Sequence, residues 1–361
     1  MGRTRSRPYF LALLALCALL LCAGPVEASV GDRLPEFKEC VEVCKQENCS
    51  PGKPQTPIRE RPRAFPSHPH PRAHKLANNG LSSHQQIAFH HRLLLWDCPS
   101  ECDHTCQSII TAGRLAAHQP VVQFHGKWPF TRILGVQEPV SVLFSAANLW
   151  AHVDGLHKVR ASIPASYTLR PFYVALAYVG VASWAASCVF HTRDFRLTEE
   201  LDYLGAGLNV LYGLYYTTVH QFRLDRPTPR RRSVLRAWTL LCSVMYLAHV
   251  AYLKLWRWDY TYNMAANVAC GLVTNLMWSY YSWRKYAQSK RTWATWPGIA
   301  VAWIILAMSL ELFDFAPVLG GNVDAHSLWH LGTVGPTVLL YNFLVKDAQD
   351  DMAGSFERFK A

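Results

Sequence analysis

Charged side chains are scarce in this sequence. Only 17% of its 361 residues are Asp, Glu, Lys or Arg, whereas 50% are hydrophobic. The hydrophobic residues are gathered in long blocks along the chain. This composition argues against an ordinary soluble domain and is typical of a membrane protein.

Acidic residues are also few. The chain has 25 Asp and Glu against 36 Lys and Arg, which gives a formal net charge of +11. Nucleic-acid binding would explain such an excess, but the basic residues lie largely in short loops between apolar blocks, where they orient membrane helices. We therefore expect no nucleic-acid partner.

The first apolar block, residues 9–23, is short for a membrane span and follows three arginines. Small residues around Val26-Glu27-Ala28 form the pattern that a signal peptidase reads. The sequence predicts a cleaved signal peptide over residues 1–28, with an uncleaved anchor as the alternative.

Six of the eleven cysteines lie in residues 29–135, in two triplets. An even number of cysteines after a signal peptide predicts three disulfides in an oxidising lumen, but it leaves their pairing open. Zinc binding by the thiols is the alternative. Asn48 begins a glycosylation sequon, whose use the sequence does not decide. The triplets are Cys40, Cys44 and Cys49, and Cys98, Cys102 and Cys106.

The middle of this predicted lumenal region differs from its flanks. Residues 51–84 are rich in Pro, Arg, Ser and His and poor in aliphatic side chains. Such a segment cannot bury enough apolar surface to fold. We expect a flexible insertion there.

Seven apolar segments follow within residues 136–346, each near the ~20 residues that cross a bilayer as a helix. They predict an all-α membrane protein: a seven-transmembrane-helix bundle with an N-terminal disulfide-rich lumenal region. The first segment, 136–153, is the weakest, because Pro139, Asn148 and His152 interrupt it; without it the count is six. The others are 168–190, 200–219, 234–253, 260–282, 296–316 and 325–345.

The basic residues predict the orientation of the bundle. With the amino-terminal region in the lumen, most loop lysines and arginines face the cytosol, as membrane insertion favours. The lumenal loops then hold only Arg193, Arg196, Lys254 and Arg257. The carboxyl-terminal tail, residues 347–361, is expected in the cytosol.

Five polar residues from three of these segments share one predicted depth. Ser187 and His191 stand one helical turn apart, Asp202 opens the next segment, and His326 and His330 are one turn apart in the last. All five fall within about two turns of the lumenal face. Ionisable groups are costly in a membrane, so their concentration indicates a functional site. Three imidazoles, a carboxylate and a hydroxyl are the groups of a catalytic zinc site.

Each of these residues taken alone is more often a helix cap or a headgroup-level side chain, and only the combination favours a metal. Glu311 and Asp314 lie at the same predicted depth. They are interpreted either as partners of the ligand imidazoles or as residues facing an aqueous cavity.

Four motifs carry a family resemblance: QFHGKWPF at 123–130, FHTRD at 190–194, LDY at 201–203 and DAHSLWH at 324–330. They resemble the post-GPI-attachment to proteins factor 3 family, GPI-anchor-remodelling phospholipases in the wider CREST superfamily of seven-span hydrolases. That superfamily also holds alkaline ceramidases and adiponectin-type receptors. The resemblance runs from about residue 31 to the end, includes both cysteine triplets and departs at 51–84.

The resemblance implies Zn²⁺ held by His191, His326 and His330, and removal of the sn-2 acyl chain of GPI anchors by zinc-activated water. Zinc lowers the pKa of a bound water to about 7. Asp202 would position this water and accept its proton, and Ser187 would donate a hydrogen bond to the oxyanion. The implied partners are GPI-anchored proteins and membrane lipids.

Two other functions stay open. A ceramidase-like amide hydrolase needs the same zinc site, but its small lipid substrate offers no surface that a cysteine-rich lumenal region could bind. A non-catalytic, metal-stabilised receptor or assembly factor is the other. The carboxyl end shows no KDEL-type retrieval signal. Mainly from the family resemblance, we expect a Golgi membrane, with the endoplasmic reticulum as the alternative. Acyl-chain preference and oligomeric state are not predicted.

Overall fold

The computed structural model describes residues 29–49 and 89–360. The predicted signal peptide and the insertion at 51–84 lie outside these residues. Within the described ranges the regular structure is helical apart from three isolated bridges. The predicted all-α class is therefore confirmed.

A small cysteine-rich unit precedes the bundle. It contains α2 (Val30–Arg33), α3 (Pro35–Asn48), α5 (Phe89–Leu93) and α6 (Cys98–Ala116). The side chain of Asp97 caps α6 by accepting a hydrogen bond from the backbone N–H of Ser100, at 2.9 Å. Phe37 and Phe124 pack with their rings tilted and the ring centroids 4.7 Å apart, and they fill the space between α3, α6 and the following loop.

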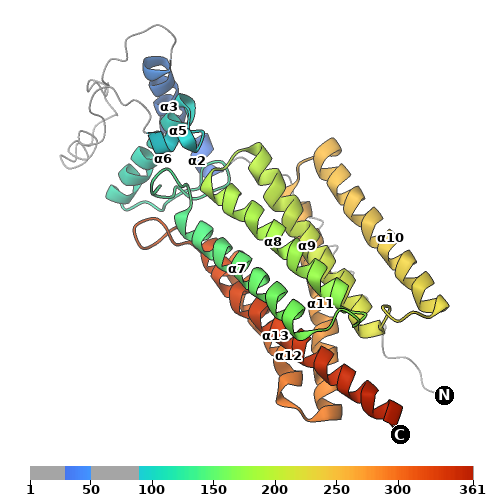
Figure 1. Cartoon of the computed structure of the whole chain (residues 1–361). Coiled ribbons are helices and arrows are strands. Elements are labelled where there is room, and N and C mark those ends of the chain that lie inside the picture. Colours follow the sequence, from blue (N-terminus) through green and yellow to red (C-terminus); the bar gives the residue numbers. More distant parts are fainter. Residues whose placement is uncertain (1–28, 50–88, 361) are drawn as a thin grey trace, which may run out of the picture.

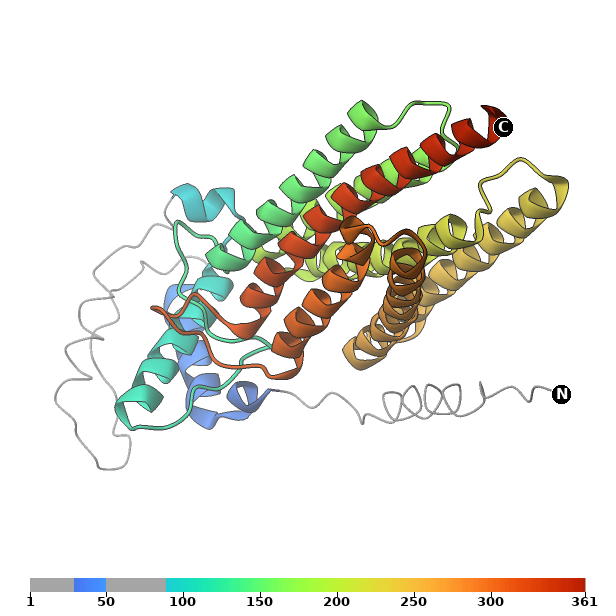
Figure 2. The same ribbon diagram turned by 90° about the horizontal axis from the view of Figure 1, so that it is seen from below.

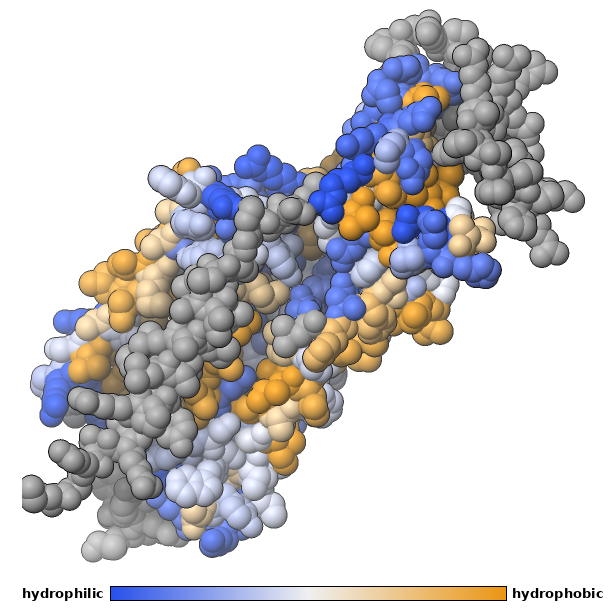
Figure 3. Space-filling model, turned by 180° about the vertical axis from the view of Figure 1, so that it is seen from behind, coloured by the Kyte–Doolittle hydropathy of each residue, from blue (hydrophilic) through white to orange (hydrophobic). Residues whose placement is uncertain are grey.

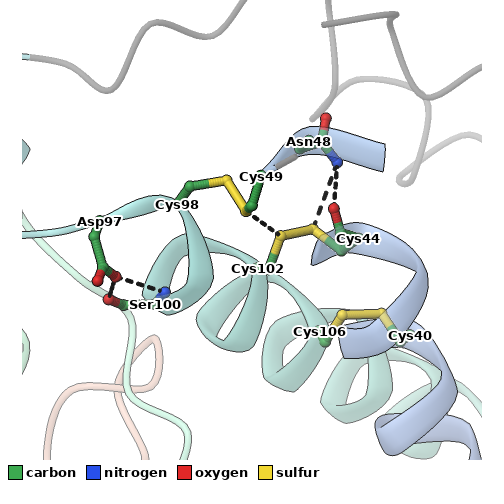
Figure 4. Close-up of a disulfide and its surroundings, with 9 residues drawn as sticks. All are labelled: Cys40, Cys44, Asn48, Cys49, Asp97, Cys98, Ser100, Cys102 and Cys106. Atoms are coloured by element: carbon green, nitrogen blue, oxygen red, sulfur yellow. Dashed lines mark hydrogen bonds between the residues drawn. A yellow bond between two sulfur atoms is a disulfide. The ribbon is translucent and has the colours of Figure 1, made fainter. Parts of the chain in front are cut away.

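Three disulfides join α3 to α6 along their length (Figure 4). Cysteines about one turn apart lie on the same face of a helix, so the two triplets face each other along neighbouring helices. The three predicted disulfides are confirmed. With every one of these sulfurs oxidised, none is left as a thiolate, which excludes the zinc alternative for this region. The pairs are Cys40–Cys106, Cys44–Cys102 and Cys49–Cys98.

The loop of residues 117–138 connects this unit to one end of the bundle (Figures 1 and 2). Arg132 forms two hydrogen bonds to Glu101 of α6, at 3.0 and 2.7 Å. At the end of the loop, the backbone N–H of Gln137 donates to the carbonyl of Thr192, and that of Glu138 to the carbonyl of His191. We call the end of the bundle that adjoins this loop the cysteine-rich end.

Seven long helices form the bundle. Proline occupies the first turn of α7, α8, α10 and α12, where its missing N–H has no partner to lose. A π-helical turn, Tyr252–Trp256, extends α10. The helices are α7 (Pro139–Ser162), α8 (Arg170–Thr192), α9 (Arg196–Phe222), α10 (Pro229–Ala251), α11 (Tyr260–Ser289), α12 (Trp296–Leu312) and α13 (Ala325–Lys360).

The order of packing brings distant segments together. Helix α7 lies between α8 and α13, α12 packs on α13, and α9 packs on α8 and α11. Helix α10 contacts mainly α9 and stands at the side of the bundle (Figure 1). As a result, the end of α8 and the beginning of α13 meet beside α7.

Four helical stretches among the described residues are long and apolar enough to cross a membrane: 170–192, 229–256, 292–311 and 325–354. Large hydrophobic side chains such as Leu240, Leu247 and Leu306 are exposed, and Figure 3 shows hydrophobic patches on the visible side of the bundle. The chain is a multi-pass membrane protein. The count of seven spans stays a prediction.

Helix α7 shows why the first segment looked weak in sequence. The helix is continuous through the three residues expected to interrupt it. Pro139 occupies its first turn, and the buried side chains of Asn148 and His152 bond to the His330 carbonyl and the Tyr341 hydroxyl of α13. Its polar residues thus face a neighbouring helix.

Candidate functional site

Three imidazoles meet at the cysteine-rich end of the bundle. His191 lies in the last turn of α8, and His326 and His330 lie in the first turns of α13. Their ring centroids are 4.6 to 5.3 Å apart. One nitrogen from each ring lies within 4.8 Å of the other two. The three predicted ligands are therefore close enough to hold one metal ion.

Each ring is fixed through its Nδ1 atom. His191 Nδ1 lies 2.7 Å from Glu138 Oε2, and His326 Nδ1 lies 3.0 Å from Glu311 Oε2. His330 Nδ1 lies 2.8 Å from the hydroxyl of Ser145. These contacts leave the three Nε2 atoms for the shared centre.

The Nε2 atoms have the environment of metal ligands. Those of His326 and His330 are 3.0 Å apart, and that of His191 is buried with no hydrogen-bond partner. A buried polar atom without a hydrogen-bond partner needs an explanation, and a bound metal ion is one of the standard explanations. Imidazoles that donate their other nitrogen to a carboxylate are typical of zinc sites. The residues present therefore fit Zn²⁺.

Ser187 and Asp202 lie beside the imidazoles. Ser187 is buried one turn before His191, and its hydroxyl is 3.1 Å from that of Ser145. The carboxylate of Asp202, in the second turn of α9, interacts with the Ser187 side chain. Ser145 contacts both Ser187 and His330, so it connects the hydroxyl side of the site to the imidazole side. All five residues singled out in the sequence are brought together.

Sequence reasoning missed two members of the site, Glu138 and Ser145. Both belong to the beginning of α7, where Ser141, Ser145 and Asn148 are all buried. Polar residues three and four apart form a stripe on one helix face. That stripe is the available signal, but only Asn148 of it entered the prediction, as an interruption of the span.

A buried ion-pair network supports Glu138. The ammonium of Lys127 lies 2.8 Å from Glu138 Oε1 and 2.8 Å from Asp194 Oδ2. The buried Glu138 carboxylate thus has a cation on one oxygen and the His191 imidazole on the other. This pairing compensates its burial and holds it in place to accept from His191. Lys127 belongs to the QFHGKWPF motif.

The two acidic residues with open roles behave differently. Glu311 contacts His326, as one of its two interpretations expected. Asp314 instead accepts hydrogen bonds from Trp128 Nε1 at 3.0 Å and from Gln123 Nε2 at 3.0 Å. Asp314 thus ties the 117–138 loop to the segment between α12 and α13.

Comparison with known proteins shows to which family the chain belongs. Residues 88–348 match the Per1-like family. The chain belongs to the Per1-like family. The resemblance inferred from the four motifs is therefore confirmed, and all five candidate residues fall inside the matched range.

Relatives of this Per1-like protein match it along most of their length. The "Protein PER1 homolog" of Schizosaccharomyces pombe is 38% identical over 344 residues, which cover 93% of this chain and 92% of that protein. The "GPI-specific phospholipase A2-like PGAP3" of Homo sapiens is 35% identical over 346 residues, covering 95% and 97%. Its Xenopus laevis counterpart is 35% identical over 333 residues, covering 91% and 93%.

Proposed function

We propose that this protein is a Zn²⁺-dependent membrane hydrolase that removes the sn-2 acyl chain from GPI anchors during lipid remodelling. One observation carries the proposal: one nitrogen of each of the three imidazoles lies within 4.8 Å of the other two, while every Nδ1 is held by a neighbouring oxygen. The printed names of the relatives support the substrate class.

The residues of the chain divide the work. Bound zinc would polarise the ester carbonyl and acidify a water. Asp202 accepts the proton of that water, and Ser187 donates a hydrogen bond to the oxyanion that develops on the former carbonyl oxygen. No acyl-enzyme is required, because Ser187 supports the attack and does not make it.

The location of the site near one end of the bundle is suitable for hydrolysis of an ester in a membrane lipid. The imidazoles belong to the last turn of one helix and the first turns of another, near one end of the bundle. We assign this end to the lumen of the secretory pathway, with the carboxyl terminus in the cytosol. The disulfides support that assignment because they persist in oxidising compartments. A Golgi membrane is our first choice, and the endoplasmic reticulum is the alternative.

Purified full-length protein tests this function directly. With zinc, it should release the sn-2 fatty acid from a GPI-anchored protein, and chelation should stop the release. Correspondingly, GPI anchors in cells that lack the protein should keep their unsaturated sn-2 chain. Release from ceramide alone would indicate the amide hydrolase, and no release from either lipid by the zinc-loaded protein would favour the receptor or assembly factor.

Glu138→Gln tests the support of the metal site. The amide keeps the shape but loses the negative charge beside His191, so zinc affinity should fall about 10- to 100-fold. A competition titration with a zinc-binding dye measures this change. Glu42→Gln, on an exposed position of α3, removes the same charge away from the site and should leave the affinity unchanged. Equal affinities for both variants would show that Glu138 does not support the metal.

A further inference from the structure

A pocket of about 260 Å³ lies between the cysteine-rich unit and the bundle. Its walls come from α6, from the 117–138 loop and from the connection between α8 and α9. Lys127 and Arg193 are the lysine and arginine side chains that line it. Both adjoin the histidine site, because Lys127 pairs with Glu138 and Arg193 follows His191 by two residues.

Lys127 and Arg193 differ in how their charges are paired. Lys127 is paired with two carboxylates. Arg193 has no carboxylate within ion-pair distance among the described residues: one of its nitrogens donates to the Asp194 backbone carbonyl and another lies 3.3 Å from the Ser100 hydroxyl. Its Nε atom is buried and has no partner there. Asp194, Asp97 and Glu101 are near enough to act on the charge of Arg193, but none of them forms an ion pair with it, so part of its hydrogen-bonding capacity is unused.

Packing holds the guanidinium of Arg193 in place. It lies 3.8 Å above the ring of Trp96, whose indole N–H donates to the Gly135 carbonyl at 2.8 Å. Arg132 also contacts this ring, at 4.1 Å, but the charge of Arg132 is paired with Glu101. A fixed, planar donor group with free capacity is the arrangement that recognises phosphate.

We propose that this pocket binds the headgroup of the lipid substrate and that Arg193 contacts its phosphate. The inference rests on the proposed function, whose substrate is a phosphoinositol lipid. In such a lipid only a few covalent bonds separate the phosphate from the sn-2 ester. A phosphate on Arg193 therefore keeps the ester next to the histidines. The hydroxyl-rich ring would lie against the polar lining, which includes Ser100, Asp103 and Gln107.

Binding of a water-soluble headgroup tests this proposal without any hydrolysis. Calorimetry on detergent-purified full-length protein would compare glycerophosphoinositol, inorganic phosphate and free myo-inositol. We expect the first to bind best, since it alone offers both phosphate and ring. Arg193→Gln should weaken its binding about 10- to 100-fold, because hydrogen bonds to a charged group are lost. Phosphate binding as tightly as glycerophosphoinositol would mean a simple anion site and would overturn the headgroup assignment.

Two further variants sharpen the test. Arg196→Gln removes a charge three residues away, from a side chain that is 84% exposed and paired with Glu200, and should bind like the wild type. Arg193→Lys keeps the charge but loses the planar fork, so an intermediate affinity is expected. It replaces the Gln variant if that variant does not fold. Wild-type affinity in the Arg193 variants would refute the proposal.

Kinetics separate this inference from the proposed function. With the lipid substrate, Arg193→Gln should raise KM about 10- to 100-fold with little change in kcat, because Arg193 binds the headgroup before and during the reaction. Headgroup binding without acyl release would overturn the proposed function and keep this inference. Acyl release with an unchanged KM in the variant would overturn this inference and keep the proposed function.

Discussion

Replacing His326 or His330 by alanine is expected to abolish bound zinc and acyl release together. Each ring supplies one of three nitrogens to the shared centre, and a catalytic zinc site has no protein ligand to spare. Loss of His330 would also remove one of the two partners of the buried Ser145 hydroxyl, the one at 2.8 Å. Metal content by mass spectrometry and fatty-acid release by the same preparation measure both effects.

A matched control separates ligand loss from general damage. His157 lies on α7 with an exposed side chain, so His157→Ala removes an imidazole from the bundle without touching the site. This variant should keep wild-type zinc and activity. Zinc-free wild-type protein that still releases the acyl chain after chelation would end the metal hypothesis.

The second large effect is expected at Asp202 and Ser187. Asp202→Asn keeps size and hydrogen bonding but cannot accept a proton, so the rate should fall by about 10²–10⁴ if Asp202 is the general base. Ser187→Ala removes one oxyanion donor and should cost about 10²–10³ in kcat. Both variants should retain zinc, since neither residue holds an Nδ1 atom.

Two outcomes would contradict this division of labour. An acyl group trapped on Ser187 would make the serine a nucleophile. Loss of zinc in Asp202→Asn would show that the carboxylate supports the metal, and its role as base would then be wrong. Single-turnover kinetics with metal analysis of the same sample distinguish these cases.

The candidate site was predictable for those residues whose ionisable side chains are energetically costly inside a membrane. Histidines and a carboxylate in apolar segments can be recognised from the sequence alone. Counting residues along each predicted helix placed them at the same depth in the membrane. Their partners did not stand out. Glu138 precedes a helix and meets His191 only through the packing of α7 on α8, a contact that no local pattern encodes.

The fold shows the same division between local and long-range information. Length and hydrophobicity predicted the helices, because these properties belong to each segment alone. The disulfide pairing depends on how α3 lies against α6, so the two triplets were predicted to be oxidised but their partners were left open. Asp314 was placed by depth near the imidazoles, but a tertiary contact with Trp128 decides its position.

The Cys49–Cys98 disulfide also affects which changes of length this chain can tolerate. Cys49 and Cys98 hold their Cα atoms 5.7 Å apart across a sequence separation of 49, so the two ends of the intervening stretch are fixed to each other. The entropy of closing a loop grows only slowly with its length. Residues can therefore be added or deleted within 51–84 without altering the register of α3 against α6, and an epitope tag inserted there should leave the bundle undisturbed.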